Sequence, residues 1–207
     1  MQMKKRISFV IAIAMGVCLV GAYAFSQDKP AEKSKGGPDP AMMKSMMEAA
    51  APGPHHKALE AMAGKFKYVN KWKMDPSQDW TTTEGDYDGH MGLDGRYLLV
   101  SVEGPMMGSK FEGMGCLGYD NNIQKYVAAW IDNMGTGIMR SEGTADNGDK
   151  TITFEGKEID PMSKKLAPYK YVYEIKSNDE FTMRWSSPSM TDGKMFESMV
   201  IEYKRVK

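Results

Sequence analysis

The sequence predicts an all-β protein whose main domain is an antiparallel up-and-down barrel of about ten strands, preceded by one or two short helices. From residue 65 onward polar and apolar residues alternate, as in strands with one buried face. Turn-forming pairs such as Asp94-Gly95 and Asn147-Gly148 recur between these runs, and no helix-length segment separates them. An even meander of hairpins closes most simply into a barrel, which removes exposed edges; a two-sheet sandwich is the alternative.

Composition excludes several classes of protein. Hydrophobic residues make up 42% of the 207, enough to build a sizeable core, so a wholly disordered chain is excluded. Lys+Arg and Asp+Glu both number 27, which leaves no basic excess to neutralise phosphates. We therefore expect no nucleic acid as a partner.

The first 24 residues are expected to be a signal peptide. Basic residues 4–6 precede an apolar run, 7–20, and Ala22-Tyr23-Ala24 is the small-x-small pattern of a cleavage site. A retained membrane anchor is the alternative, and lipidation at Cys18 is disfavoured by the bulky Val17 before it. We expect an exported protein, periplasmic or extracellular, with no stable membrane anchor after cleavage.

Residues 25–51 are expected to be a disordered linker that carries one short helix. Residues 25–38 contain few large apolar side chains, whereas Asp39-Pro40 is typical of a helix start and Pro52 of a stop. The helix is rich in methionine, and its thioethers form either an apolar docking face or a copper(I) site in an exported protein, with two histidines following closely. The methionines are Met42, Met43, Met46 and Met47, and the histidines are His55 and His56.

The barrel domain is expected to span residues 52–207. A second helix, 54–63, carries Leu59 and Met62 on one side and is placed to plug one end of the barrel. Ten alternating runs follow, at about 65–74, 79–91, 96–104, 110–119, 124–132, 137–145, 150–159, 169–176, 180–186 and 194–205. Cleavage of the signal peptide leaves Cys116 as the one cysteine, so no intramolecular disulfide forms, and its apolar context indicates an inert thiol.

The sequence contains no complete catalytic or metal-binding motif. Residues 113–118 match G-x-G-x-x-G, yet a turn and another strand follow where a dinucleotide site needs a helix. Glycines in a curved strand relieve crowding, which explains the match better. Residues 86–89 lack the later ligands of a calcium loop, and H-E-x-x-H, C-x-x-C and G-x-S-x-G are all missing from the sequence. We expect a protein that is not an enzyme, name no metal ligands and leave its cofactor unknown.

Four residues are candidates for a small-ligand site. Parity places Trp130 and Asp132 on one face of the run 124–132, and Arg140 and Glu142 together on one face of the next. If Trp130 points inward, Asp132 does as well, and with Arg140 and Glu142 it forms a polar handle in an apolar cavity. A solvated barrel rim with a weak ion pair is the other interpretation.

The chain resembles the bacterial family known as domain of unknown function 1579 over about residues 52–207. The segments that carry the resemblance are 52–57, 95–98, 111–115, 118–120, 125–127, 130–137, 141–144 and 201–205. It implies a lipocalin-like barrel and brings no established activity. Lipocalin-type barrels open with Gly-x-Trp and set an Arg of the last strand against that ring; here the sequence reads Gly64-Lys65-Phe66, and Arg205 fits the partner position.

The function that these observations favour is binding of a small apolar or amphipathic ligand in a barrel cavity. Methionine and aromatic side chains form an adaptable lining for such a ligand. Two alternatives remain open: copper(I) handling by the methionine-rich helix, and a ligand-free structural or interaction domain.

Overall fold

The computed structural model of the chain describes residues 37, 39–160 and 163–207. The expected signal peptide and residues 25–36 of the expected linker lie outside these residues. Among the described residues, no helix has both the length and the apolar character needed to cross a membrane.

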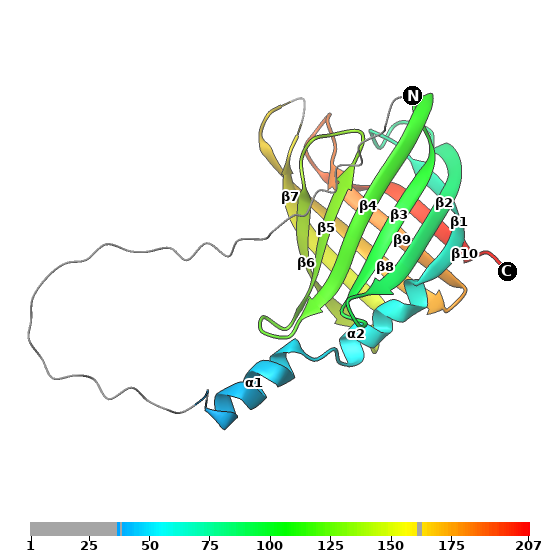
Figure 1. Cartoon of the computed structure of the whole chain (residues 1–207). Helices are drawn as coiled ribbons and strands as arrows, with labels where there is room; N and C mark the ends of the chain where they lie inside the picture. Colours follow the sequence, from blue (N-terminus) through cyan, green and yellow to red (C-terminus); the bar gives the residue numbers. More distant parts are fainter. Residues whose placement is uncertain (1–36, 38, 161–162) are drawn as a thin grey trace, which may run out of the picture. The chain divides into compact units, whose positions relative to one another are not determined.

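Ten strands form one closed antiparallel barrel (Figure 1), so the predicted fold class is confirmed and the sandwich alternative is wrong. Each strand pairs with its neighbours in the sequence, and β1 pairs with β10 to close the ring. The strands are β1 Gly64–Trp72, β2 Thr81–Gly92, β3 Tyr97–Met106, β4 Ser109–Asp120, β5 Lys125–Asp132, β6 Met139–Asp146, β7 Thr151–Ile159, β8 Leu166–Ser177, β9 Glu180–Pro188 and β10 Met195–Arg205.

Tight turns set the register of the hairpins. Residues 147–150 connect β6 to β7: the Lys150 amide donates to the Asn147 carbonyl, and the two central residues, Gly148 and Asp149, both have a φ of 62°, as this turn requires. The turn between β3 and β4 lies later than the sequence predicts, with the strand expected to end at about residue 104: β3 continues to Met106, and Met107 and Gly108 form the turn with φ of 50° and 80°. This shift of the turn extends both strands towards the same end of the barrel.

Within the described residues, three short helical segments precede β1: α1 Pro40–Ala50, α2 Pro54–Ala58 and the 3-10 helix η1 Leu59–Met62. The side chain of Asp39 accepts a hydrogen bond from the Ala41 amide, the expected N-cap. Leu59 and Met62 are fully buried, and the Tyr87 hydroxyl donates to the Met62 carbonyl across 2.9 Å. The second predicted helix therefore exists as α2 and η1 together and closes one end of the barrel (Figure 1).

Aromatic rings fill the barrel beside this closed end. Phe66 and Phe181 make edge contacts with a centroid separation of 5.0 Å, and Phe181 stacks on Tyr203 at 4.2 Å. Burial strongly raises the pKa values of the Tyr87 and Tyr203 hydroxyls, so these phenols stay neutral. The closed end is thus a solid core, and any space inside the barrel lies towards the other end.

Candidate functional site

The closed end is held by Arg205, which lies over the ring of Phe66 with 4.4 Å between the guanidinium carbon and the ring centroid. Its guanidinium also donates to the carbonyl oxygens of Ala61 and Ala63, at 3.2 and 2.8 Å, and through Nε to that of Asn178 at 2.7 Å. Arg205 thereby joins η1, the last strand and the β8–β9 turn. The pair of Arg205 and Phe66 is therefore part of the structural core at this end of the barrel.

A cavity of about 360 Å³ occupies the interior towards the opposite end of the barrel. Such a volume falls in the range of small-molecule sites, and most of the lining is methionine and aromatic. Among the described lining residues none is Lys, Arg or His. The methionines are Met106, Met134, Met139, Met183 and Met199, and the aromatic residues are Tyr68, Tyr87, Phe111, Trp130, Tyr169, Tyr171, Tyr173, Trp185 and Tyr203.

Trp130 and Asp132 both lie in this cavity, on β5. The indole Nε1 of Trp130 donates to Oδ2 of Asp132 at 2.8 Å, and Oδ1 of Asp132 accepts from the Met134 amide at 2.9 Å. A Cβ on Gly113 would stand 2.2 Å from the Trp130 ring, and one on Gly115 2.9 Å from it. The first two glycines of the G-x-G-x-x-G match therefore make room for the tryptophan.

Arg140 and Glu142 do not join Trp130 and Asp132, which corrects the sequence expectation. Trp130 pairs with Met139 across β5 and β6, and paired residues share a face of the sheet. The inward residues of β6 are therefore Met139 and Ser141, whereas Arg140 and Glu142 are exposed on the outer face. The parity assigned to this strand was wrong by one residue, which exchanges its two faces.

Arg140 and Glu142 instead line an outer groove that crosses β3 to β7. The groove is larger than the interior cavity, at about 740 Å³, but it is open to solvent along the sheet. Glu142 pairs there with Lys125 at 2.5 Å. Cys116 also lies in the groove, half-buried, and burial raises the pKa of its thiol, which disfavours the reactive thiolate.

An aromatic wall on β8 and β9 is the main part of the cavity that sequence reasoning missed. The indole of Trp185 stacks on Tyr171 with an interplanar angle of 6° and on Tyr169 with one of 15°. The Tyr171 and Ser141 hydroxyls hydrogen-bond at 2.6 Å. The signal was present in the sequence, because Tyr169, Tyr171 and Tyr173 occupy alternate positions of one strand and must share one face.

Asn70 is a second residue that the sequence did not single out. It lies on β1 with 4% of its surface exposed, and it lines the cavity. Its Oδ1 is buried and has no hydrogen-bond partner among the described residues. Glu158 lines the cavity near the end of β7, and partial burial, followed by the charges of Asp132 and Asp160, raises the pKa of its carboxyl.

The methionine-rich helix α1 buries none of its residues, so the expected docking face has no partner within the described chain. Copper(I) binding by the methionines of α1, the alternative to a docking face, remains a prediction. The two histidines have other contacts: His55 stacks on Tyr119 at 4.2 Å and bonds Asp149 at 2.9 Å, and His56 is buried. The described residues contain no cluster of three or more His, Cys, Asp or Glu side chains that could hold a metal.

Residues 51–205 match the model of the family described as "Protein of unknown function (DUF1579)". Two solved structures with similar folds are Rv2717c from M. tuberculosis and the S-type phycobiliprotein lyase CPES from Guillardia theta. Rv2717c has a TM-score of 0.54 at 13% identity, covering 76% of this chain and 100% of its own. The lyase has a TM-score of 0.51 at 9% identity, covering 73% of this chain and 92% of its own, so both likenesses concern the fold alone. No curated protein matches the sequence. The family match spans most of the chain, and the protein therefore belongs to the DUF1579 family.

Proposed function

We propose that this protein is exported and binds a small apolar or amphipathic molecule inside the barrel. The observation that carries the proposal is the interior cavity of about 360 Å³, lined by methionine and aromatic side chains. Protein interiors are otherwise packed as densely as organic crystals, so a volume of this size is typical of a binding site. Met183 and Met199 supply flexible, polarisable walls that adapt to the shape of a ligand.

The two ends of the barrel differ in a way that supports this function. Leu59, Met62 and the Arg205 contacts close one end, whereas the cavity extends to Met106 and Met134, beside the loops of the other. A ligand therefore enters at the end that carries Asp132 and Glu158. Its apolar part packs against the rings of β8 and β9.

A fluorescent probe tests binding directly. N-phenyl-1-naphthylamine is neutral and apolar, and we expect it to bind with enhanced emission and to accept energy from Trp130 and Trp185. Ala128→Phe places a ring inside the cavity and abolishes binding, whereas the matched control Val127→Phe places the same ring on the outer face. If Ala128→Phe fails to fold by circular dichroism, Val102→Trp blocks the cavity from another wall. Equal probe affinity in the blocked and control variants contradicts the proposal.

Mass spectrometry of the protein purified from the cell envelope tests export and occupancy together. We expect the denatured chain to begin at Phe25, because the Ala22-Tyr23-Ala24 pattern precedes it. Under native conditions we expect a discrete excess mass that denaturation removes. A chain that retains residues 1–24 would contradict signal cleavage.

A further inference from the structure

Three residues of the described cavity lining carry acceptors that lack a donor or a balancing cation: Asn70, Asp132 and Glu158. Asn70 is the clearest case, because its buried Oδ1 has no donor among the described residues. An unpaired buried acceptor costs free energy unless a ligand supplies the missing donor. Asn70 lies on β1, paired with Thr83 and Ile201, so its position is fixed by the sheet on both sides.

Two carboxylates face the cavity from the other side of the barrel. Asp132 lies on β5 and Glu158 on β7, each four strands around the ring from β1. Asp132 accepts one hydrogen bond on each carboxylate oxygen, from Trp130 Nε1 and from the Met134 amide; both donors are neutral, so they do not balance its negative charge. The charge of Asp132 is one of the causes that raise the pKa of Glu158, so the two groups repel each other.

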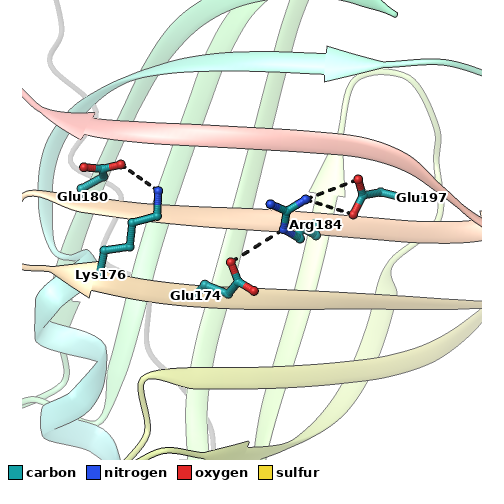
Figure 2. A network of polar contacts seen from close by, with 5 residues as sticks. All are labelled: Glu174, Lys176, Glu180, Arg184 and Glu197. Carbon is teal, nitrogen blue, oxygen red and sulfur yellow. Dashed lines mark hydrogen bonds and ion pairs between the residues drawn. The ribbon is translucent and has the colours of Figure 1, made fainter.

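No basic side chain balances this pair within the cavity, as far as the described lining residues extend. Arg140, which the sequence placed beside Asp132, points outward. On the outer face, cations are paired with outer carboxylates: Figure 2 shows Arg184 between Glu174 and Glu197, at 3.7 and 3.2 Å. Positive charge is thus distributed over the outside of this part of the barrel, whereas the charged residues in the described cavity lining, Asp132 and Glu158, are both acidic.

We propose that the ligand of this cavity is an apolar cation, an amine whose ammonium group lies at the rim beside Asp132 and Glu158. This inference rests on the proposed function and adds the charge of the ligand to it. The apolar body packs among the methionine and aromatic side chains, and Trp130 offers a ring face that also attracts cations. Asn70 Oδ1 accepts a hydrogen bond from a second donor, such as a hydroxyl group. Anions of the fatty-acid type are repelled by the same carboxylates.

Three probes that share a naphthalene ring separate the effect of ligand charge on affinity from the effect of ligand size. They are 2-naphthylmethylamine, 2-naphthalenemethanol and 2-naphthoate. We expect titration calorimetry to give the amine about tenfold higher affinity than the alcohol, because two partly screened carboxylates lie close to its charge. The acid binds weakest of the three. Raising the ionic strength narrows the difference between amine and alcohol, since the rim is open to solvent.

Glu158→Gln is the decisive variant, because it removes one rim charge and keeps the shape of the side chain. It lowers amine affinity about fivefold and leaves alcohol affinity unchanged. Glu155→Gln removes the same charge from the outer face of the same strand and leaves all three affinities unchanged. Equal losses of amine affinity in both variants would mean that the net charge of the protein, and not the rim, attracts the amine.

Asn70→Leu tests the acceptor on the opposite wall. The wild-type protein binds 6-(aminomethyl)-2-naphthol more tightly than 2-naphthylmethylamine, and the variant loses this preference because leucine cannot accept a hydrogen bond. If 2-naphthoate binds the wild type as tightly as the amine, and Ala128→Phe still blocks both, the inference about charge is overturned while the proposed function stands. If Ala128→Phe leaves the binding of every probe unchanged, the proposed function fails with it.

Discussion

Arg205 is expected to contribute more to stability than any single surface ion pair of this barrel, and Arg205→Met measures that contribution. The side chain is one-quarter exposed and donates to three backbone carbonyls, those of Ala61, Ala63 and Asn178. Charge-assisted hydrogen bonds contribute about 1.5 to 3 kcal/mol each when buried, and we take about 1 kcal/mol for partly exposed ones. The contact with Phe66 adds about 0.5 to 1 kcal/mol. We therefore expect Arg205→Met to lower the free energy of unfolding by about 3 to 4 kcal/mol.

The assay is reversible urea unfolding, followed by circular dichroism and tryptophan fluorescence. Methionine keeps an apolar side chain over Phe66, so the fall in the free energy of unfolding measures the contribution of the guanidinium group. Arg205→Lys keeps the charge without the planar fork and recovers less than half of the loss. For a domain of this size, 3 kcal/mol corresponds to a fall of about 10 °C in Tm.

Arg184→Met is the matched control, because Arg184 is an arginine with two carboxylate partners that lies on the outer face (Figure 2). Exposed ion pairs contribute about 0 to 1 kcal/mol to stability, so we expect the free energy of unfolding of the control to stay within about 1 kcal/mol of the wild-type value. Two results would refute the stabilising role of Arg205 at the closed end. One is an equal loss of the free energy of unfolding in both variants, and the other is a loss of less than about 1 kcal/mol in Arg205→Met.

Three further predictions concern other features of the barrel. Gly64→Ala is expected to cost at least about 2 kcal/mol in urea unfolding, because its φ is +125° and the added Cβ would stand 2.0 Å from Arg205 Nη1. Gly113→Ala displaces the Trp130 ring, which shifts its emission and weakens naphthyl-probe binding at least fivefold; unchanged emission would contradict the packing. Hydrogen bonds from neighbouring hydroxyl groups lower the pKa of Asp75 from 3.8 to about 2. Since the folded pKa is the lower one, the stabilisation is present above pH 4 and lost as the pH falls through 2; NMR titration of the carboxyl near 3.8 would contradict this.

The strand count followed from the sequence because each hairpin carries its own information: alternation marks the buried face, and turn residues mark the ends. The error at β6 shows where this information stops. Ile138 and Met139 are both apolar, so alternation alone fits either parity, and residues 133–138 form a connection too irregular to fix the register. Pairing of Met139 with Trp130 settles the parity, and that contact is known only once the sheet is built.

The cavity was harder to predict than the barrel for a related reason. Trp130 and Asp132 could be predicted because they lie two residues apart on one strand, whereas Asn70 and Glu158 lie 88 positions apart and line one cavity only because the ring of strands closes. Asn70 carries no local signal, since an amide in a strand is unremarkable until its oxygen proves to be buried and unpaired. Alternation along a strand therefore predicts which of its residues face the interior of a barrel. It does not predict which residues of different strands come together in one site.

The two ends of the barrel also use charge in opposite ways, and this difference bears on selectivity. At the closed end one partly buried cation, Arg205, satisfies backbone carbonyls, so its charge stabilises the fold. At the open end Asp132 and Glu158 face the cavity with no basic residue among its described lining. A methionine-lined wall discriminates poorly between apolar bodies of similar size, because thioether side chains adapt their shape. If the barrel binds an apolar ligand as we propose, charge at the rim is the property by which it distinguishes one such ligand from another. Exchanging the sign at Glu158, by Glu158→Lys, is then expected to reverse the preference from 2-naphthylmethylamine to 2-naphthoate.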